Sequence, residues 1–281
     1  MVKKKFQDLN LNNAFLFAAA LEDPETCRMV LEMILEKDIP NITVHIEHSM
    51  LYSSDFRSIR LDVYATDEMR VEYNVEMQNA DEKNLAKRAR FHQAQMDVAS
   101  LEPGEDFAGL RPGYVIFICT YDPYGDGLYR YTFENTCREN GRLFGDETLK
   151  IVLNTKGTRD SQASGLLVEF LHYVENSTDA YVKDVAKTSK VHKLHDKIRA
   201  LKKKREWEER YMRFEELLQE RENVGREIGE AHGREIGKAQ GQNKMLELIL
   251  RMTENDEADQ ISRLKSDPQF LDSMYEKYDL Q

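Results

Sequence analysis

Residues 61–78, "LDVYATDEMRVEYNVEMQ", alternate apolar and polar side chains in two short runs on either side of "DEM". A period of two is typical of β-strands, because successive side chains of a strand point to opposite sides. If the two runs pair as a hairpin, Asp62 faces Asn74 or Glu76, depending on the register. In either register one face of the hairpin carries the same polar side chains, Asp62, Asn74, Glu76 and Gln78.

This polar face has two interpretations. Cross-strand neighbours lie roughly 5 to 8 Å apart, so Asp62 and Glu76 could share one cation. An all-oxygen site with few protein ligands suits Mg²⁺, which polarises a phosphoryl oxygen and activates a bound water for phosphodiester hydrolysis. Gln78 would orient that water through its amide, without the positive charge of a lysine. The alternative is a solvated face, because antiparallel sheets commonly have one wet side.

The rest of the first 178 residues predicts a mixed α/β order. Two helices are expected before Pro40, with Asn residues suited to capping the first and Pro24 starting the second. Three strands follow up to residue 78, then a helix in "NLAKRARFHQAQMDVASL". Three more strands, "YVIFICTY", "LYRYTFEN" and "TLKIVLNT", precede a closing helix in "GLLVEFLHYVEN". We expect an α/β sandwich with a mixed sheet.

The chain changes character after Asn176. The following segment has no Gly or Pro up to Gly225 and is dense in Lys, Arg and Glu, which is typical of a long exposed helix. We therefore place a domain boundary near residue 178, with 1–178 as one domain and 179–281 as a helical, charged C-terminal region.

Glycines recur every fourth residue in "VGREIGEAHGREIGKAQGQ", at Gly225, Gly229, Gly233, Gly237 and Gly241. Each interior glycine costs a helix about 1 kcal/mol relative to alanine. The segment is therefore a frayed linker, a helix whose glycine stripe lets another helix approach, or a repeat expanded by slippage without any selected contact. The surrounding helix formers favour a helix, and we expect homo-oligomer formation through the C-terminal helices, as in a coiled coil.

The net charge of -11 argues against a protein that coats nucleic acid by bulk electrostatics. The net charge does not exclude a local basic groove, whose charges would come from Lys83, Lys87, Arg88, Arg90 and the run 202–205. The three cysteines have no paired spacing, which argues against a disulfide framework or a zinc site. No apolar run approaches the ~20 residues that span a bilayer, and the polar start lacks a signal-peptide core, so we expect a cytoplasmic protein.

Several longer strings occur in a recognisable order. They are "RLDVYA", "YNVEMQ", "KRARFHQAQMD", "GEDF", "YVIFICTYDPYGDGLYRYTFEN" and "GDETLKIVLNTKG". Together they resemble the PD-(D/E)xK nuclease family transposases, also called recombination-promoting nucleases, over residues 6–176 and on into the glycine-spaced tail. The resemblance implies an α/β, restriction-endonuclease-like core with a mixed central sheet flanked by helices, plus a long helical C-terminal extension.

The resemblance also implies a catalytic set. The family signature places an Asp on one strand and E-x-K, here E-x-Q, on the next, which correspond to Asp62, Glu76 and Gln78. Asp62, Glu76 and the carbonyl of Met77 would hold Mg²⁺ or another divalent cation, and Gln78 would position water. DNA would be the substrate.

The helix after this signature carries basic and amide residues in the family, matched here by Arg88, Arg90 and Gln93. Arg90 and Gln93 share a helix face from which they could hold the scissile phosphate. The alternative is an ordinary amphipathic helix whose inward residues are Leu85, Ala89 and Met96.

One position departs from the family pattern. Members often carry an acidic residue ahead of the first helix's Phe residues, whereas this chain has Asn12, Asn13 and Ala14 before Phe15.

The sequence therefore leaves two alternative functions. The first is a metal-dependent DNA endonuclease that hydrolyses phosphodiester bonds. The second is a catalytically weakened nuclease fold that serves as a DNA-binding or oligomerising interaction module.

Overall fold

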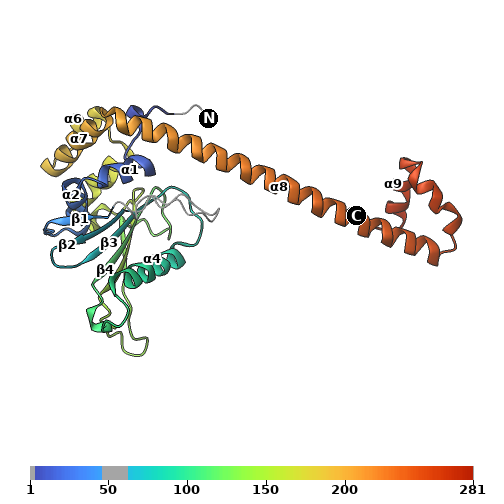
Figure 1. The fold of residues 1–281 in the computed structure, drawn as a ribbon, viewed down its shortest axis with the longest axis horizontal. Coiled ribbons are helices and arrows are strands. Elements are labelled where there is room, and N and C mark those ends of the chain that lie inside the picture. The colour runs from blue at the N-terminus through green and yellow to red at the C-terminus, as the bar shows by residue number, and fades with distance from the viewer. Residues whose placement is uncertain (1–3, 46–62, 281) are drawn as a thin grey trace. The chain divides into compact units, whose positions relative to one another are not determined.

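The computed structural model describes residues 4–45 and 63–280 (Figure 1). The chain divides into two compact units, Met1–Tyr211 and Met212–Gln281. None of the helices in the described ranges is both long and apolar enough to cross a lipid bilayer.

A six-stranded mixed sheet forms the centre of the first unit, in the order β1-β2-β3-β4-β6-β5. The first three strands pair antiparallel as a meander, β4 runs parallel to β3 and to β6, and β5 closes the edge antiparallel to β6. The bounds are Ile42–Val44 for β1, Val63–Asp67 for β2, Glu72–Gln78 for β3, Gly113–Cys119 for β4, Arg130–Phe133 for β5 and Thr148–Asn154 for β6. The mixed sheet with flanking helices confirms the expected fold class.

The first two helices begin where the sequence predicts. In α1 (Ala14–Leu21) the side chain of Asn13 accepts a hydrogen bond from the backbone N–H of Leu16 at 3.1 Å. In α2 (Pro24–Leu35) Asp23 accepts from the backbone N–H of Thr26, and a proline occupies the first turn. Each cap satisfies an N–H group that the helix itself leaves unpaired.

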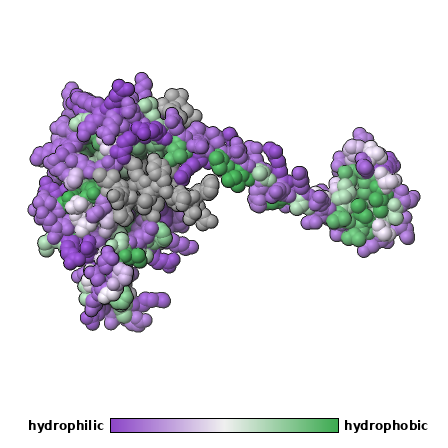
Figure 2. Space-filling view, viewed as in Figure 1, coloured by the Kyte–Doolittle hydropathy of each residue, from purple (hydrophilic) through white to green (hydrophobic). Residues whose placement is uncertain are grey.

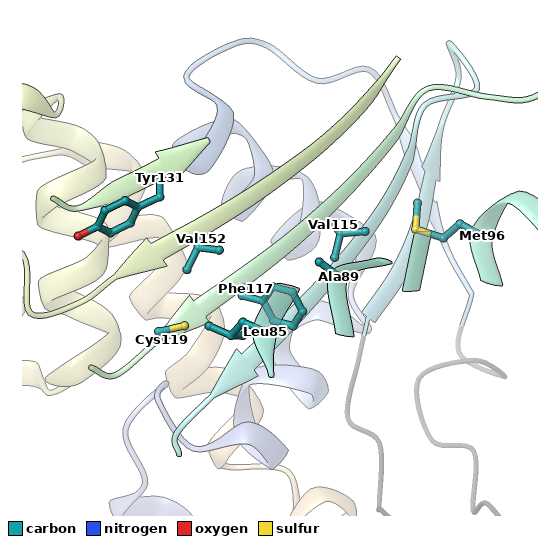
Figure 3. Packing of buried hydrophobic residues seen from close by; sticks show 8 residues of the cluster. All are labelled: Leu85, Ala89, Met96, Val115, Phe117, Cys119, Tyr131 and Val152. Atoms are coloured by element: carbon teal, nitrogen blue, oxygen red, sulfur yellow. The ribbon is translucent and has the colours of Figure 1, made fainter. Parts of the chain in front are cut away.

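Helices cover both faces of the sheet (Figure 1). The helix α4 (Leu85–Ser100) packs on the face that carries Val115, Phe117 and Cys119 of β4, and its inward residues include the three expected ones (Figure 3). These are Leu85, Ala89 and Met96. The opposite face carries the buried Ile116 and Ile118 and is covered by α1 and α2, and α5 (Gly165–Glu175) packs against α2.

The first unit extends beyond the boundary expected near residue 178. Its helix α7 (Ser189–Lys202) packs on α1, α2 and α5, and α6 (Asp179–Asp184) packs on α7. Val191, Leu194 and Ile198 of α7 are at most 1% exposed, because they form an apolar stripe at helical spacing beneath a strongly charged outer surface. The charged composition of this segment therefore conceals a buried face.

The beginning of α8 (Arg205–Glu254) also belongs to the first unit. The ring of Trp207 lies 6.3 Å from that of Phe15, and Tyr211 contacts both Phe15 and Phe6. The guanidinium of Arg210 lies 4.0 Å from the Trp207 ring centroid and pairs with Glu22.

The second unit has a small core of its own. Leu248 and Met252 near the end of α8 pack with Leu264 of the 3₁₀ segment η4 (Ala258–Lys265) and Met274 of α9 (Pro268–Lys277). Hydrophobic residues gather on the face of this unit that Figure 2 shows.

The glycine repeat is helical throughout, which confirms the helix interpretation and excludes a frayed linker. All five glycines lie inside α8. A Cβ atom built at any of them would meet no atom of the described chain within 4 Å, apart from the helix's own nearby backbone. Packing within the described part of one chain therefore does not account for the stripe.

The position of the boundary can be tested by truncation. A chain that ends at residue 211 is expected to unfold cooperatively in urea, whereas one that ends at residue 178 is not. The shorter chain lacks Val191, Leu194 and Ile198 and exposes the apolar surfaces that they cover. The loss of this burial lowers the free energy of unfolding by roughly 5 kcal/mol, out of a total of about 5 to 15 kcal/mol. Circular dichroism at increasing urea concentration measures this. Equal unfolding midpoints for both chains would contradict the extended first unit.

Candidate active site

The polar face of β3 is buried, which excludes the solvated-face interpretation for its described residues. Every residue of β3 is buried, because the strand lies between β2 and β4 and α4 covers its polar side. The polar side chains alternate with apolar ones and remain below 10% exposed: Glu72 at 2%, Asn74 at 6%, Glu76 at 9% and Gln78 at 6%. Buried groups of this kind need partners.

Asp62, the expected partner of Glu76, lies outside the described residues. The described pairing of β2 with β3 begins with Val63 opposite Val75 and continues with Tyr64 opposite Asn74. Glu76, Met77 and Gln78 therefore lie beyond the described part of β2.

Arg88 of α4 provides the positive charge next to Glu76. Its Nη2 donates to Glu76 Oε1, and its Nη1 donates to Gln78 Oε1 at 2.6 Å. The amide nitrogen of Gln78 donates in turn to the Ala80 carbonyl at 2.5 Å. Both ends of the Gln78 amide are thus engaged, and one guanidinium links the two signature residues of β3.

The structure also brings His92 to this cluster, a residue that is not among the site residues predicted from the sequence. His92 is 4% exposed, and its Nε2 lies 3.3 Å from Glu76 Oε2. Its ring packs edge-on against Phe117 at 6.0 Å. The available signal was its spacing of four residues from Arg88, which places both side chains on the same side of a helix.

The Glu76 carboxylate fits a metal ligand. Its Oε1 pairs with Arg88, whereas its buried Oε2 accepts no hydrogen bond from a described residue, despite the nearby His92. A buried carboxylate oxygen without a donor suits a divalent cation. However, no three His, Cys, Asp or Glu side chains of residues 4–45 and 63–280 are grouped to hold a metal ion.

The backbone of β3 fits the further ligand expected at Met77. The Gln78 carbonyl accepts from Thr120 N–H and so points towards β4. Neighbouring carbonyls along a strand point to opposite sides, so the Met77 carbonyl points towards the β2 side.

The two other predicted residues of α4 lie apart from this cluster. Gln93 is 7% exposed, donates to Asp97 at 2.9 Å and lies against Gly113, where an added Cβ would come within 2.5 Å of its amide nitrogen. Arg90 is exposed, because two residues turn a helix about 200° from Arg88. Arg90 and Gln93, which were expected to act from one helix face, therefore differ in exposure: Arg90 is exposed and Gln93 is buried.

A second polar cluster continues along the same face of β3. Arg111 Nη1 lies 3.2 Å from Glu72 Oε1. Burial raises the pKa of Glu72, against the lowering effects of Tyr64 and Arg111. Beside Gln78 in the β3–β4 register, burial raises the pKa of Cys119 to about 12, so this residue is a neutral thiol at physiological pH and not an activated nucleophile.

Asn12, at the position where family members often carry an acid, is hydrogen-bonded on two sides. Its amide donates to Glu175 of α5 at 3.2 Å, and its carbonyl accepts from Asn79, the residue after β3. Glu175 also accepts from Thr155 and pairs with Lys156 at 3.0 Å. Burial opposes ionisation here, but these partners together lower the pKa of Glu175, so it is ionised.

Comparison with known protein families identifies the chain. The sequence model of the PD-(D/E)XK nuclease family transposases matches residues 16–227, which include the entire described sheet, the Glu76 cluster and the first half of α8. No curated protein and no solved structure gives a significant match. Because the match covers well over half of the chain, this protein belongs to the PD-(D/E)XK nuclease family transposases.

Proposed function

We propose that this protein is a DNA endonuclease that hydrolyses phosphodiester bonds with the help of Mg²⁺ or a similar divalent cation. The observation that carries the proposal is the buried Glu76 carboxylate: one oxygen pairs with Arg88, and the other, which lies 3.3 Å from His92 Nε2, accepts no hydrogen bond from a described residue. Membership of a family of nucleases and transposases supports DNA as the substrate.

Asp62, Glu76 and the Met77 carbonyl would hold the cation. Asp62 directly precedes β2 in the sequence, and β2 pairs with the strand that carries the other two. When bound, the cation supplies a Lewis acid for the phosphoryl oxygen and lowers the pKa of a water molecule. His92 lies against the Glu76 carboxylate and would keep it oriented, as the outer-shell partners of metal ligands commonly do.

Arg88 would supply the charge that Gln78 lacks. A lysine at the third signature position would place a positive group beside the reacting phosphate, whereas an amide cannot. Here the guanidinium of Arg88 lies within hydrogen-bond distance of Gln78 Oε1. The exposed Arg90 would contact the DNA backbone from the solvent side, while the burial of Gln93 restricts it to supporting α4.

A second candidate function rests on the same contacts. Arg88 neutralises Glu76, the Gln78 amide is engaged at both ends, and Asn12 replaces an acid. A nuclease fold with its acid already paired could serve as a DNA-binding or oligomerising module without cutting. Mg²⁺-dependent cleavage of plasmid DNA separates the two functions, because only the first produces it.

We also propose that α8 mediates homo-oligomer formation. Its glycine stripe has open space beside it, and exposed apolar side chains lie next to the glycines, among them Ile228 at 59% and Ile236 at 44%. A helix with this surface buries little alone, whereas a second copy can approach closely over the glycines.

Replacing either acid is expected to abolish Mg²⁺-dependent cleavage of plasmid DNA. Asp62→Asn and Glu76→Gln should each lower the rate about a thousandfold, because metal stabilisation of the transition state amounts to several kcal/mol. Asp126→Asn changes the same charge in an exposed turn and serves as the matched control. Full cleavage by both acid variants would exclude the assignment.

Exchanging the positive group tests the role of Arg88. Arg88→Gln should reduce cleavage at least tenfold, and adding Gln78→Lys should restore part of it, since the lysine returns a charge to the same place. Thermal unfolding of each variant shows whether loss of the Glu76 partner has unfolded the protein. Unchanged cleavage by a folded Arg88→Gln variant would contradict this role.

Bulky side chains in the glycine stripe are expected to block self-association. Light scattering should give a multiple of 32.8 kDa for the full chain and a lower mass for the Gly229→Leu, Gly233→Leu variant. The Gly→Ala pair at the same positions is the control, because alanine keeps the surface nearly flat while favouring the helix. A monomer mass for all three proteins would refute the proposal.

A further inference from the structure

The segment 183–205 is strongly basic within an acidic chain. Ten of its residues are Lys or Arg and two are Asp, whereas the whole chain carries a net charge of -11. Only one face of α7 is buried, so the other faces of the helix are exposed to solvent. Most of these cations therefore lie on the surface. Favourable interaction with the helix dipole accounts for basic residues only in the last turn of α7.

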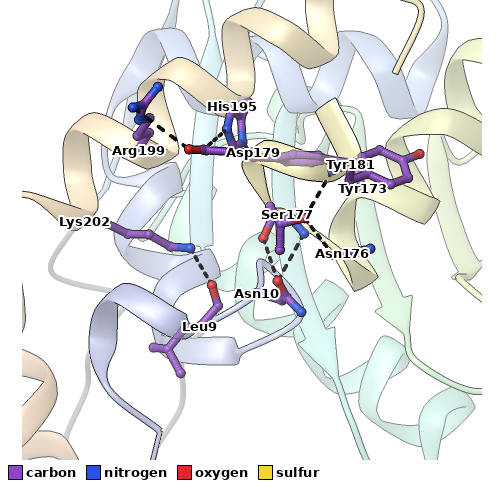
Figure 4. Close-up of polar contacts among 11 residues, drawn as sticks. Leu9, Asn10, Tyr173, Asn176, Ser177, Asp179, Tyr181, His195, Arg199 and Lys202 are labelled. Atoms are coloured by element: carbon purple, nitrogen blue, oxygen red, sulfur yellow. Dashed lines mark hydrogen bonds and ion pairs between the residues drawn. The ribbon is translucent and has the colours of Figure 1, made fainter. Parts of the chain in front are cut away.

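Some of these cations fasten the segment to the first unit. Lys190 pairs with Glu32 of α2 at 2.9 Å, and Lys197 pairs with Asp23 at 3.0 Å. The amine of Lys202 donates to the Leu9 carbonyl at 2.5 Å (Figure 4). These contacts account for three of the ten basic residues.

Five exposed lysines have no such explanation. None of them forms an ion pair with a residue in the described part of the chain. We call them the α7 basic surface, although only Lys193 lies in α7 itself, while Lys183 and Lys187 precede that helix and Lys203 and Lys204 follow it. Beside Lys203 lies a concavity of about 450 Å³, lined by Arg199 and Lys202 but also by Asp8 and Asp179, so the positive surface consists of the exposed lysines and not of this concavity.

We propose that the α7 basic surface binds the sugar-phosphate backbone of DNA, at a distance from the cleavage site. Phosphate contacts rely on Lys and Arg, and an acidic chain repels DNA unless a local surface supplies the opposite charge. The inference rests on the proposed function, since a DNA endonuclease needs such a surface.

The position of α7 separates this contact from the Glu76 cluster. The helix packs on α1 and α2, which cover one face of the sheet, whereas α4 and the Glu76 cluster occupy the other (Figure 1). DNA at the α7 basic surface is therefore a different segment from the one at Glu76, and the surface adds affinity for long DNA without entering the chemistry.

The test measures binding of the full chain to fluorescent duplex DNA in EDTA, where metal-dependent cleavage cannot occur. The triple variant Lys193→Gln, Lys203→Gln, Lys204→Gln should bind about tenfold more weakly at ~0.1 M salt, and its logarithmic salt dependence should fall by up to about 3. The control Arg142→Gln, Lys238→Gln, Lys265→Gln removes the same charge from exposed sites elsewhere and should bind as the wild type does.

Three outcomes overturn the proposal. They are equal affinities and salt dependences for both triple variants, an equal loss in both, and wild-type binding to anionic phosphatidylserine vesicles but not to DNA. A chain that never cuts DNA, yet loses binding only in the α7 variant, would refute the endonuclease and leave the α7 basic surface in place. Circular dichroism verifies that both variants are folded.

Discussion

The burial of β3 on both faces is the constraint on which the first unit depends. The strand carries four polar side chains into a space that α4 closes, and a buried carboxylate without a partner is too costly to persist. The helix meets this demand with Arg88, which engages Glu76 and Gln78 together. The Arg88 contacts and the buried contacts of Leu85, Ala89 and Met96 together hold α4 on the sheet.

The sheet and its helices were largely predictable from the sequence. Alternation in 61–78 predicts the β2–β3 hairpin, and the capping residues Asn13 and Asp23 predict the starts of α1 and α2. Both are local signals, because each depends on residues close together in the chain. The domain boundary was not predictable from composition, since the charges of α7 conceal the stripe of Val191, Leu194 and Ile198.

The site was predictable only in part. The burial of Glu76 and the contact of Arg88 depend on how α4 packs, and helical spacing alone leaves the rotation of that helix about its axis open. For this reason helical spacing groups the exposed Arg90 with the buried Gln93, and it does not single out His92, which lies against Glu76. A single known contact between α4 and β3 would have resolved both points.

The anchoring of α8 has a spectroscopic consequence. Trp207 is the only tryptophan in the chain, and it lies in the first unit between Phe15 and the guanidinium of Arg210. Its emission therefore reports on one junction alone, the attachment of the first turns of α8 to α1, and is silent about the small core around Leu248 and Met274. Tryptophan fluorescence would thus follow the first unit alone, whereas helical circular dichroism sums over the helices of both units. A helical transition without a matching change in fluorescence would therefore report the second unit, without any added label.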